Sequence, residues 1–273
     1  MSMFKALTIA GSDSSGGAGL QADLKTFQEL GVYGMSAITV IVSMNPKDWS
    51  HNVFPQPIET VKSQLKTILA IGVDALKTGM LGTTELIELA ADTIEKHPLK
   101  NVVVDPVLVC KGADEILHPE NATYLREVLV PKATIVTPNL FEAAQLSQRA
   151  PITTLEEMKN AAQRIYDLGC PYVLIKGGAK LVHEKAIDVF YDGETFEVLE
   201  GDRINTTFTH GAGCTYSAAI TAELAKGKPI REAVHTAKAF ITEAIRHSFR
   251  LNEHAGPTNH AAYRKYCQNL PTS

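Results

Sequence analysis

The chain has 273 residues, a length that suits one large domain or two small ones with a full hydrophobic core. Hydrophobic residues make up 45% and charged residues 21%, and the net charge is −4, which is ordinary for a globular protein and argues against a nucleic-acid surface. No basic run favours a membrane surface, and no stretch has the length of a transmembrane helix. The four cysteines form no CxxC pair, so we expect free thiols and a cytoplasmic location.

Short apolar runs alternate with helical patterns along most of the chain. The runs are often β-branched and predict buried strands over residues 6–10, 37–42, 75–77, 101–105, 134–137 and 172–175. Apolar residues at three- and four-residue spacing predict helices around residues 20–27, 86–94 and 158–165. This alternation predicts an α/β fold with a mostly parallel sheet covered by helices on both faces.

The pattern changes after the sixth predicted strand. Residues 187–191 and 195–199 flank Asp192-Gly193, which predicts an antiparallel hairpin with a tight primed turn. Two further helices are expected, over residues 213–225 and 230–247. No linker, repeat or low-complexity segment interrupts these elements, so we expect a single domain over residues 1–273.

Glycine-rich and polar segments follow several predicted strands. In a parallel sheet, ligands bind beyond the carboxyl ends of the strands, so these segments should meet in one cleft. They are residues 11–19, 105–112, 138–142 and 176–178.

The turn Gly211-Ala212-Gly213-Cys214 precedes an apolar helix. Glycines at a helix start let backbone N–H groups approach an anion, and the helix dipole favours its negative charge. Two glycines alone are more typical of an ordinary capping turn, so the wider context has to decide.

That context is a resemblance that covers nearly the whole chain, with motifs in family order. The motifs are Ala10-Gly11-Ser12-Asp13-Ser14, Gly16-Gly17-Ala18-Gly19, Gln21-Ala22-Asp23, Lys77-Thr78-Gly79-Met80-Leu81, Asp105-Pro106-Val107, Thr137-Pro138-Asn139 with Glu142, Lys176-Gly177-Gly178, and Gly211 to Cys214. Together they resemble the ribokinase-like superfamily, and within it the branch of hydroxymethylpyrimidine (phosphate) kinases and two-cysteine bacterial pyridoxal kinases. The resemblance implies a three-layer ribokinase-like fold.

The resemblance also implies a function. It points to ATP-dependent phosphorylation of the hydroxymethyl group of pyridoxal or pyridoxine, with Mg²⁺ and a homodimeric assembly. Hydroxymethylpyrimidine (phosphate) kinase is the first alternative, although this chain lacks the glutamine that the pyrimidine branch often carries near Met44 and Asn45. A nucleotide-binding regulator without catalysis is the second, because a fold does not fix a function.

The implied catalytic groups are the backbone of Gly211, Ala212 and Gly213 and two cysteines. Cys214 stands where the superfamily usually has an aspartate base, and a helix start lowers the pKa of a thiol, so we expect a thiolate base. Its plain alternative is a small buried hydrophobe. Cys110 is implied to capture an aldehyde substrate as a hemithioacetal, or else to have no chemical role.

The ATP-binding set implied by the family is Asn139, Glu142, Lys176, Gly177, Gly178 and Gly213. Glu142 would hold Mg²⁺ through water, and Asp105 is a second candidate for the metal or for pairing with a lysine. Asn139 and Glu142 also fit a helix capping box, and both roles can hold together. Lys176 and its glycines also fit an ordinary turn after a strand.

The implied acceptor-binding set is Gly11, Ala18, Gly19, Asp23, His51, Met80, Val107 and Cys110. A rival reading is a dinucleotide fingerprint over residues 17–22, but no acidic residue follows the second predicted strand to bind a ribose, and the chain has no P-loop motif. Asp23 could bond the ring or be a solvated helix charge, and His51 could be a surface histidine.

Overall fold

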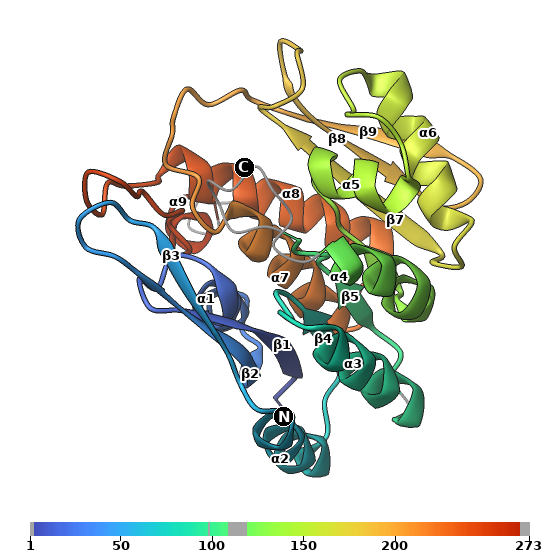
Figure 1. The fold of residues 1–273 in the computed structure, drawn as a ribbon. Coiled ribbons are helices and arrows are strands. Elements are labelled where there is room, and N and C mark those ends of the chain that lie inside the picture. Colours follow the sequence, from blue (N-terminus) through green and yellow to red (C-terminus); the bar gives the residue numbers. More distant parts are fainter. Residues whose placement is uncertain (1–2, 98, 109–118, 268–273) are drawn as a thin grey trace.

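The computed structural model describes residues 3–97, 99–108 and 119–267 (Figure 1). One nine-stranded sheet runs through these residues in the order β3-β2-β1-β4-β5-β6-β7-β8-β9. The strands are β1 (Lys5–Asp13), β2 (Tyr33–Met44), β3 (His51–Pro55), β4 (Ala75–Thr78), β5 (Val102–Val104), β6 (Ile135–Val136), β7 (Tyr172–Gly178), β8 (Ala186–Tyr191) and β9 (Phe196–Gly201). In this spatial order the six strands from β2 to β7 pair in parallel, while β3, β8 and β9 join the two edges antiparallel. The predicted mostly parallel sheet is confirmed.

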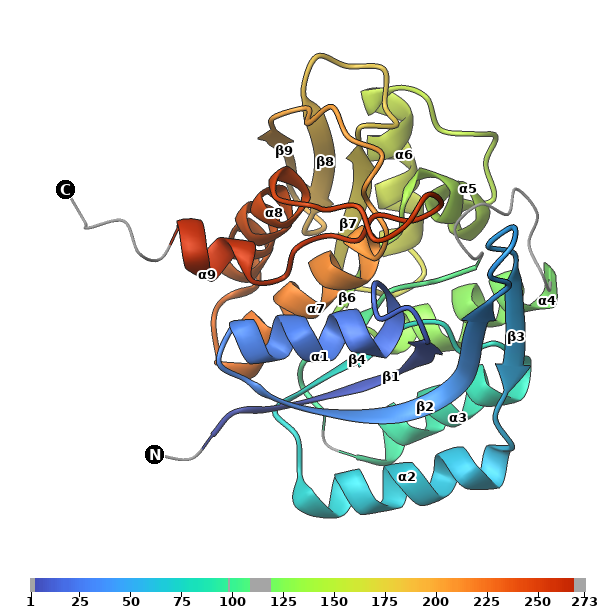
Figure 2. The ribbon, with the colours of Figure 1, turned by 90° about the vertical axis from the view of Figure 1, so that its left-hand side faces the viewer.

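Helices cover both faces of the sheet (Figure 2). They are α1 (Gly19–Glu29), α2 (Ile58–Ile71), α3 (Thr84–Lys96), α4 (Pro119–Tyr124), α5 (Leu140–Ser147), α6 (Leu155–Tyr166), α7 (Ala212–Ala225), α8 (Ile230–Arg246) and α9 (Ala262–Tyr266), with a π turn over Leu125–Leu129 and a 3-10 turn over Val130–Lys132. Two separate apolar clusters result. One joins the sheet to α2, α3, α5 and α6, and the other joins it to α1, α7 and α8.

Alternation along the strands explains the two clusters. Leu76 and Val104 face the cluster beneath α3, whereas Ala75 and Val103 face the cluster beneath α7. Successive side chains of a strand point to opposite faces, so a continuous apolar run is the pattern of a strand buried on both sides. The predicted three-layer arrangement is confirmed.

The hairpin of β8 and β9 is confirmed, but the predicted two-residue turn is wrong. Tyr191 pairs with Phe196, which leaves four residues in the loop. The Asp192 carboxylate accepts hydrogen bonds from the backbone N–H groups of Glu194 and Thr195, at 3.0 and 2.7 Å. This side chain closes a wider loop than the Asp-Gly pair alone would predict.

Among the residues that the structure describes, no helix is long and apolar enough to cross a membrane. The expectation of a single domain stays a prediction, which the continuity of the sheet supports.

Candidate active site

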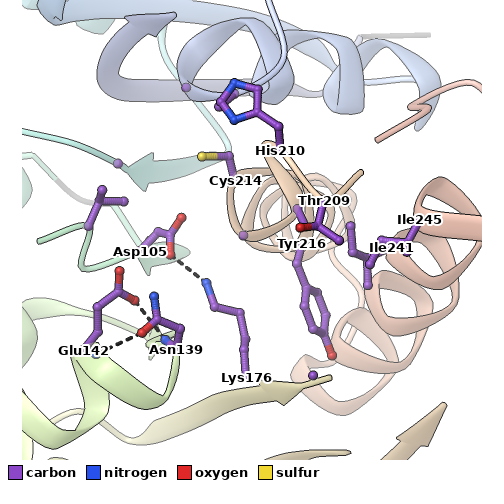
Figure 3. Close-up of a pocket in the computed structure, with 18 of the residues that line it drawn as sticks. Asp105, Asn139, Glu142, Lys176, Thr209, His210, Cys214, Tyr216, Ile241 and Ile245 are labelled. Atoms are coloured by element: carbon purple, nitrogen blue, oxygen red, sulfur yellow. Dashed lines mark hydrogen bonds and ion pairs between the residues drawn. The ribbon is translucent and has the colours of Figure 1, made fainter. Parts of the chain in front are cut away.

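A cavity of about 550 Å³ lies at the carboxyl ends of the central strands (Figure 3). It brings together segments that are far apart in the sequence, as predicted. The expected site residues in its wall are Gly11, Ala18, Gly19, His51, Met80, Asp105, Val107, Asn139, Glu142, Lys176, Gly177, Gly178, Gly211, Ala212, Gly213 and Cys214. Asp23 is not among the lining residues, and Cys110 lies outside the part of the chain that the structure describes.

The turn before α7 has the geometry of an anion site. Gly211 adopts φ 78°, in the left-handed region, and a Cβ atom there would collide with the carbonyl oxygen of Gly17. The first intrahelical bond runs from the N–H of Thr215 to the carbonyl of Gly211, at 2.9 Å. The N–H groups of Gly213 and Cys214 therefore belong to a first turn that offers them no intrahelical acceptor.

Ala212 differs from these two residues. Its N–H donates to the carbonyl oxygen of Thr209 at 3.2 Å, so it is already used within the turn. The N–H groups of Gly213 and Cys214 are therefore better placed to bind an anion than that of Ala212, whose expected role stays a prediction.

The thiol of Cys214 lies in the cavity wall close to Gly19, at the start of α1. Burial raises its pKa to about 12, although the charge of Lys77 and the N–H of Gly19 act in the opposite direction. The predicted lowering of this pKa is wrong, because the loss of water around the sulfur outweighs the effect of the helix start. The resting thiol is neutral at physiological pH.

A row of buried charges lies along the cavity floor. Lys176 Nζ is 2.8 Å from Asp105 Oδ1, and Lys77 Nζ is 3.9 Å from Asp105 Oδ2. Ser217 donates its hydroxyl to Asp105 at 3.1 Å. Burial alone would raise the pKa of Asp105, but Lys176 and Lys77 lower it, so the carboxylate is ionised. Asp105 thus pairs with lysines and orients Lys176 toward the cavity.

Asn139 and Glu142 form the predicted capping box at the start of α5. The Asn139 side chain accepts the N–H of Glu142 at 2.9 Å, and Glu142 accepts the N–H of Asn139 at 2.8 Å. Glu142 also lines the cavity. Burial raises its pKa to about 7, and Asp105 adds to this rise while Lys176 opposes it. Glu142 therefore both caps the helix and offers a titratable carboxylate at the cavity wall.

Asp23 lies beneath the cavity. It is fully buried, and Oδ2 accepts hydrogen bonds from Thr8 at 2.6 Å and from Lys77 at 3.1 Å. The alternative of a solvated helix charge is wrong, because the carboxylate is fully buried, while its predicted contact with the ring stays a prediction that its absence from the cavity wall does not support. It balances the charge of Lys77, which is buried at the cavity floor and was not assigned a role from the sequence.

The acceptor end of the cavity is partly apolar. Val42, Met44, Met80 and Val107 lie in its wall near the loop after β1. His51 belongs to the same wall and is half-buried, and its pKa is lowered by burial and by the nearby His210. The alternative of a plain surface histidine is therefore not supported.

His210 was missed by the sequence reasoning. Its Nε2 lies 2.7 Å from Asp13 Oδ2, and both side chains are buried. Burial alone would raise the pKa of Asp13, but hydrogen bonds from His210 and Ser15 lower it to about 2. A histidine directly before the Gly211 turn was the available signal.

The opposite end of the cavity lies against α8. Ile241 and Ile245 line it (Figure 3). In the sequence the two α8 residues fit the apolar face of a helix, so their role in the cavity could not be distinguished from core packing.

Comparisons with known proteins agree with this geometry. A family model described as phosphomethylpyrimidine kinase matches residues 13–259. Pyridoxine kinase of Bacillus subtilis (strain 168) is 63% identical over 266 residues, covering 97% of this chain and 98% of that protein. Hydroxymethylpyrimidine/phosphomethylpyrimidine kinase of the same organism is 42% identical over 270 residues, covering 98% and 99%.

A solved structure extends the similarity to three dimensions. The pyridoxal kinase from Staphylococcus aureus in complex with AMP-PCP and pyridoxal matches with a TM-score of 0.93 and 49% identity, covering 97% of this chain and 96% of that chain. This chain therefore belongs to the phosphomethylpyrimidine kinase family, within the ribokinase-like superfamily.

Proposed function

We propose that this protein is an ATP-dependent kinase that phosphorylates the hydroxymethyl group of pyridoxine and pyridoxal. The observation that carries the proposal is a single cavity in which Lys176 and the first turn of α7 lie between a partly apolar acceptor end and an end lined by α8. The relatives support it, since the 63% identical protein is a pyridoxine kinase and the S. aureus pyridoxal kinase binds both pyridoxal and the ATP analogue AMP-PCP.

The cavity suits in-line phosphoryl transfer. The transition state of this reaction is loose, and its negative charge spreads over the phosphoryl oxygens. The N–H groups of Gly213 and Cys214 and the ammonium group of Lys176 would bind those oxygens. Asp105 pairs with Lys176 at 2.8 Å and fixes its ammonium group at the cavity, so little reorganisation is needed at the moment of transfer.

The donor groups also fit Mg²⁺. Within the described ranges, no cluster of three His, Cys, Asp or Glu side chains could hold a metal. A site with few protein ligands suits a Mg²⁺ ion that is bound mainly by phosphates and water, with Glu142 reaching it through water. Asp105 is the weaker candidate because its two oxygens already bind Lys176 and Ser217. When bound, Mg²⁺ would neutralise part of the phosphate charge.

Cys214 is the group proposed to take the proton from the attacking hydroxyl. A base must be unprotonated, whereas the resting thiol has a pKa of about 12. Lys77 and the N–H of Gly19 are the groups that favour the thiolate. The proposal therefore implies that turnover rises as the solution becomes alkaline.

Cys110 is proposed to bind pyridoxal covalently. Its sulfur would add to the aldehyde carbon, and the thiol proton would pass to the aldehyde oxygen, giving a hemithioacetal without oxidation. Pyridoxine has no aldehyde, so Cys110→Ala should reduce kcat/KM for pyridoxal while leaving that for pyridoxine nearly unchanged. Equal residual activity on both substrates would end this idea.

Hydroxymethylpyrimidine is the second candidate acceptor. The family description and the 42% identical relative favour it, and one enzyme could serve both rings. The pyridine ring is favoured because the cavity wall has the apolar Met44 in the region where the pyrimidine branch often carries a glutamine. A regulator without catalysis is disfavoured, because Cys214 and Glu142 both line the cavity.

The deciding experiment measures ADP release with pyridoxine, pyridoxal and hydroxymethylpyrimidine, and with no acceptor. We expect ADP only when an acceptor is present, with phosphate on its hydroxymethyl group by mass spectrometry. Tight binding of AMP-PCP without ADP formation from any acceptor would support the regulator instead. The homodimer and the cytoplasmic location belong to the same proposal, and light scattering tests the first.

A further inference from the structure

The loop that joins β2 to β3 carries an unusual residue. Trp49 has φ 59°, in the left-handed region that favours glycine and asparagine. Gln148 is the other non-glycine residue with positive φ in the described part of the chain, and it ends α5 as a helix cap, where this conformation is ordinary. A tryptophan in such a position needs a compensating contact.

Within the loop, the N–H of Trp49 donates to the carbonyl of Asn45 at 2.8 Å, and outside it the side chain contacts the ring of His254. The two rings stack with centroids 6.0 Å apart and planes 19° from parallel. Figures 1 and 2 both show the β2–β3 loop beside the loop that follows α8, which carries His254. Two segments about 200 residues apart in the sequence therefore meet at this point.

The β2–β3 loop is close to the acceptor. Met44 and His51, which flank it and pair with each other across the two strands, both line the acceptor end of the cavity. Trp49 and His254 themselves are not lining residues. A shift of the loop would move the wall without removing any group that touches the ligand.

The loop with His254 is in turn bonded to the anion site. The N–H of His210 donates to the carbonyl of Gly256 at 3.0 Å, and the N–H of Thr258 donates to the carbonyl of His210 at 3.2 Å. Gly256 packs so closely on the ring of Phe208 that a Cβ atom would not fit. His210 directly precedes the Gly211 turn, so this segment has little freedom to move alone.

We propose that Trp49 and His254 form a latch, a contact that positions the acceptor wall (Met44 and His51) against the phosphate-binding turn (Gly211 to Cys214). The contact is continuous from Met44 and His51, through the two stacked rings and Gly256, to His210 and Gly211. Trp49 and His254 are positioning residues. Closing the latch couples the two ends of the cavity, so nucleotide bound at the turn favours the closed acceptor wall, and the acceptor favours nucleotide.

Trp49 is the only tryptophan of the chain, so its fluorescence reports the latch directly. AMP-PCP should lower the acrylamide quenching constant of Trp49 at least about twofold, the size expected for a modest coupling free energy. His254→Ala should abolish this change. His247→Ala is the matched control, because it removes a similar stack: the ring centroids of His247 and Tyr266 are 3.8 Å apart, and neither residue lines the cavity. This variant should respond to AMP-PCP like the wild type.

Kinetics provide the second arm, which rests on the proposed function. Trp49→Gly relieves the strained backbone, so it should unfold at the same temperature as the wild type or higher, while losing the stacked ring. The KM for pyridoxine should nevertheless rise about three- to tenfold, with kcat changed less, because the closed wall is less populated. A purely structural role of Trp49 would not produce a stable variant with this split.

The fluorescence arm needs no acceptor, so it decides the latch even if no vitamin is phosphorylated. The proposal is overturned if AMP-PCP leaves the quenching of Trp49 unchanged, or changes it equally in His254→Ala. It is also overturned if Trp49→Gly turns over pyridoxine with a wild-type KM.

Discussion

Replacing Cys214 tests whether its sulfur is the base of the reaction. A thiol with a pKa of about 12 is thiolate in roughly one molecule in 10⁵ at pH 7, since each pH unit is a factor of ten. If that thiolate takes the proton, kcat should rise about tenfold per pH unit between pH 7 and 9. Cys214→Asp should move the rise to lower pH, because a carboxyl group ordinarily ionises at a far lower pH than a thiol.

The assay is coupled ADP release at saturating ATP and pyridoxine in a buffer of constant ionic strength. Cys214→Ala is the matched control. Pyridoxine ionises identically in the wild-type and variant assays, so the ratio of wild-type kcat to variant kcat removes the effect of its ionisation. We expect that ratio to grow with pH. A ratio that is flat from pH 6 to 9, or an alanine variant with wild-type kcat, would refute the base role.

Further predictions concern the turn, the metal carboxylate and the buried pair. Gly211→Ala should destabilise the protein by about 2 kcal/mol or more and abolish turnover, because φ is positive and the new Cβ would collide with Gly17. Gly227→Ala is the control in thermal unfolding: its φ of 82° gives the same backbone strain, but no atom lies within 4 Å of the new Cβ. Folding raises the pKa of Glu142 from 4.5 to about 7, so the folded protein holds this proton more tightly than the unfolded chain. The free energy of unfolding should therefore fall by roughly 3 kcal/mol as the pH rises from 4.5 to 7. Glu142→Gln should remove this pH dependence in urea unfolding and should lower kcat. Chelation of Mg²⁺ by EDTA should stop ADP release, and added Mg²⁺ should restore it. Asp23→Asn should lower the free energy of unfolding by about 3 kcal/mol, because Lys77 loses a buried partner at 3.1 Å, whereas an unchanged melting temperature would contradict that pairing.

Most strands of the sheet were predictable because each one follows from a local apolar pattern, whereas their order in the sheet was not predicted. Strands such as β5 and β7 are buried on both faces, so their apolar runs stand out from the sequence. β3 was missed because it is an edge strand whose residues are largely exposed or half-buried and which ends in Pro55. α2 was missed too, although Val61, Leu65 and Ile68 are spaced as one buried helix face.

The position of the site was predictable, but the protonation of its groups was not. Strand ends of a parallel sheet meet at one edge whatever the side chains are, so the lining segments could be named in advance. The pKa of Cys214 depends on how much water packing leaves around the sulfur, which no local pattern encodes. For the same reason Asp23 fitted a solvated helix charge in the sequence, whereas tertiary packing buries it against Lys77.

The mechanism requires that the terminal phosphate of ATP binds at the start of α7. A crystal structure of this protein with AMP-PCP and pyridoxine measures this directly. We predict the terminal phosphate within hydrogen-bond distance of the N–H groups of Gly213 and Cys214 and of Lys176 Nζ, with the pyridoxine hydroxyl beside the Cys214 sulfur. A terminal phosphate bound away from this turn, or a hydroxyl directed away from it, would rule out this mechanism.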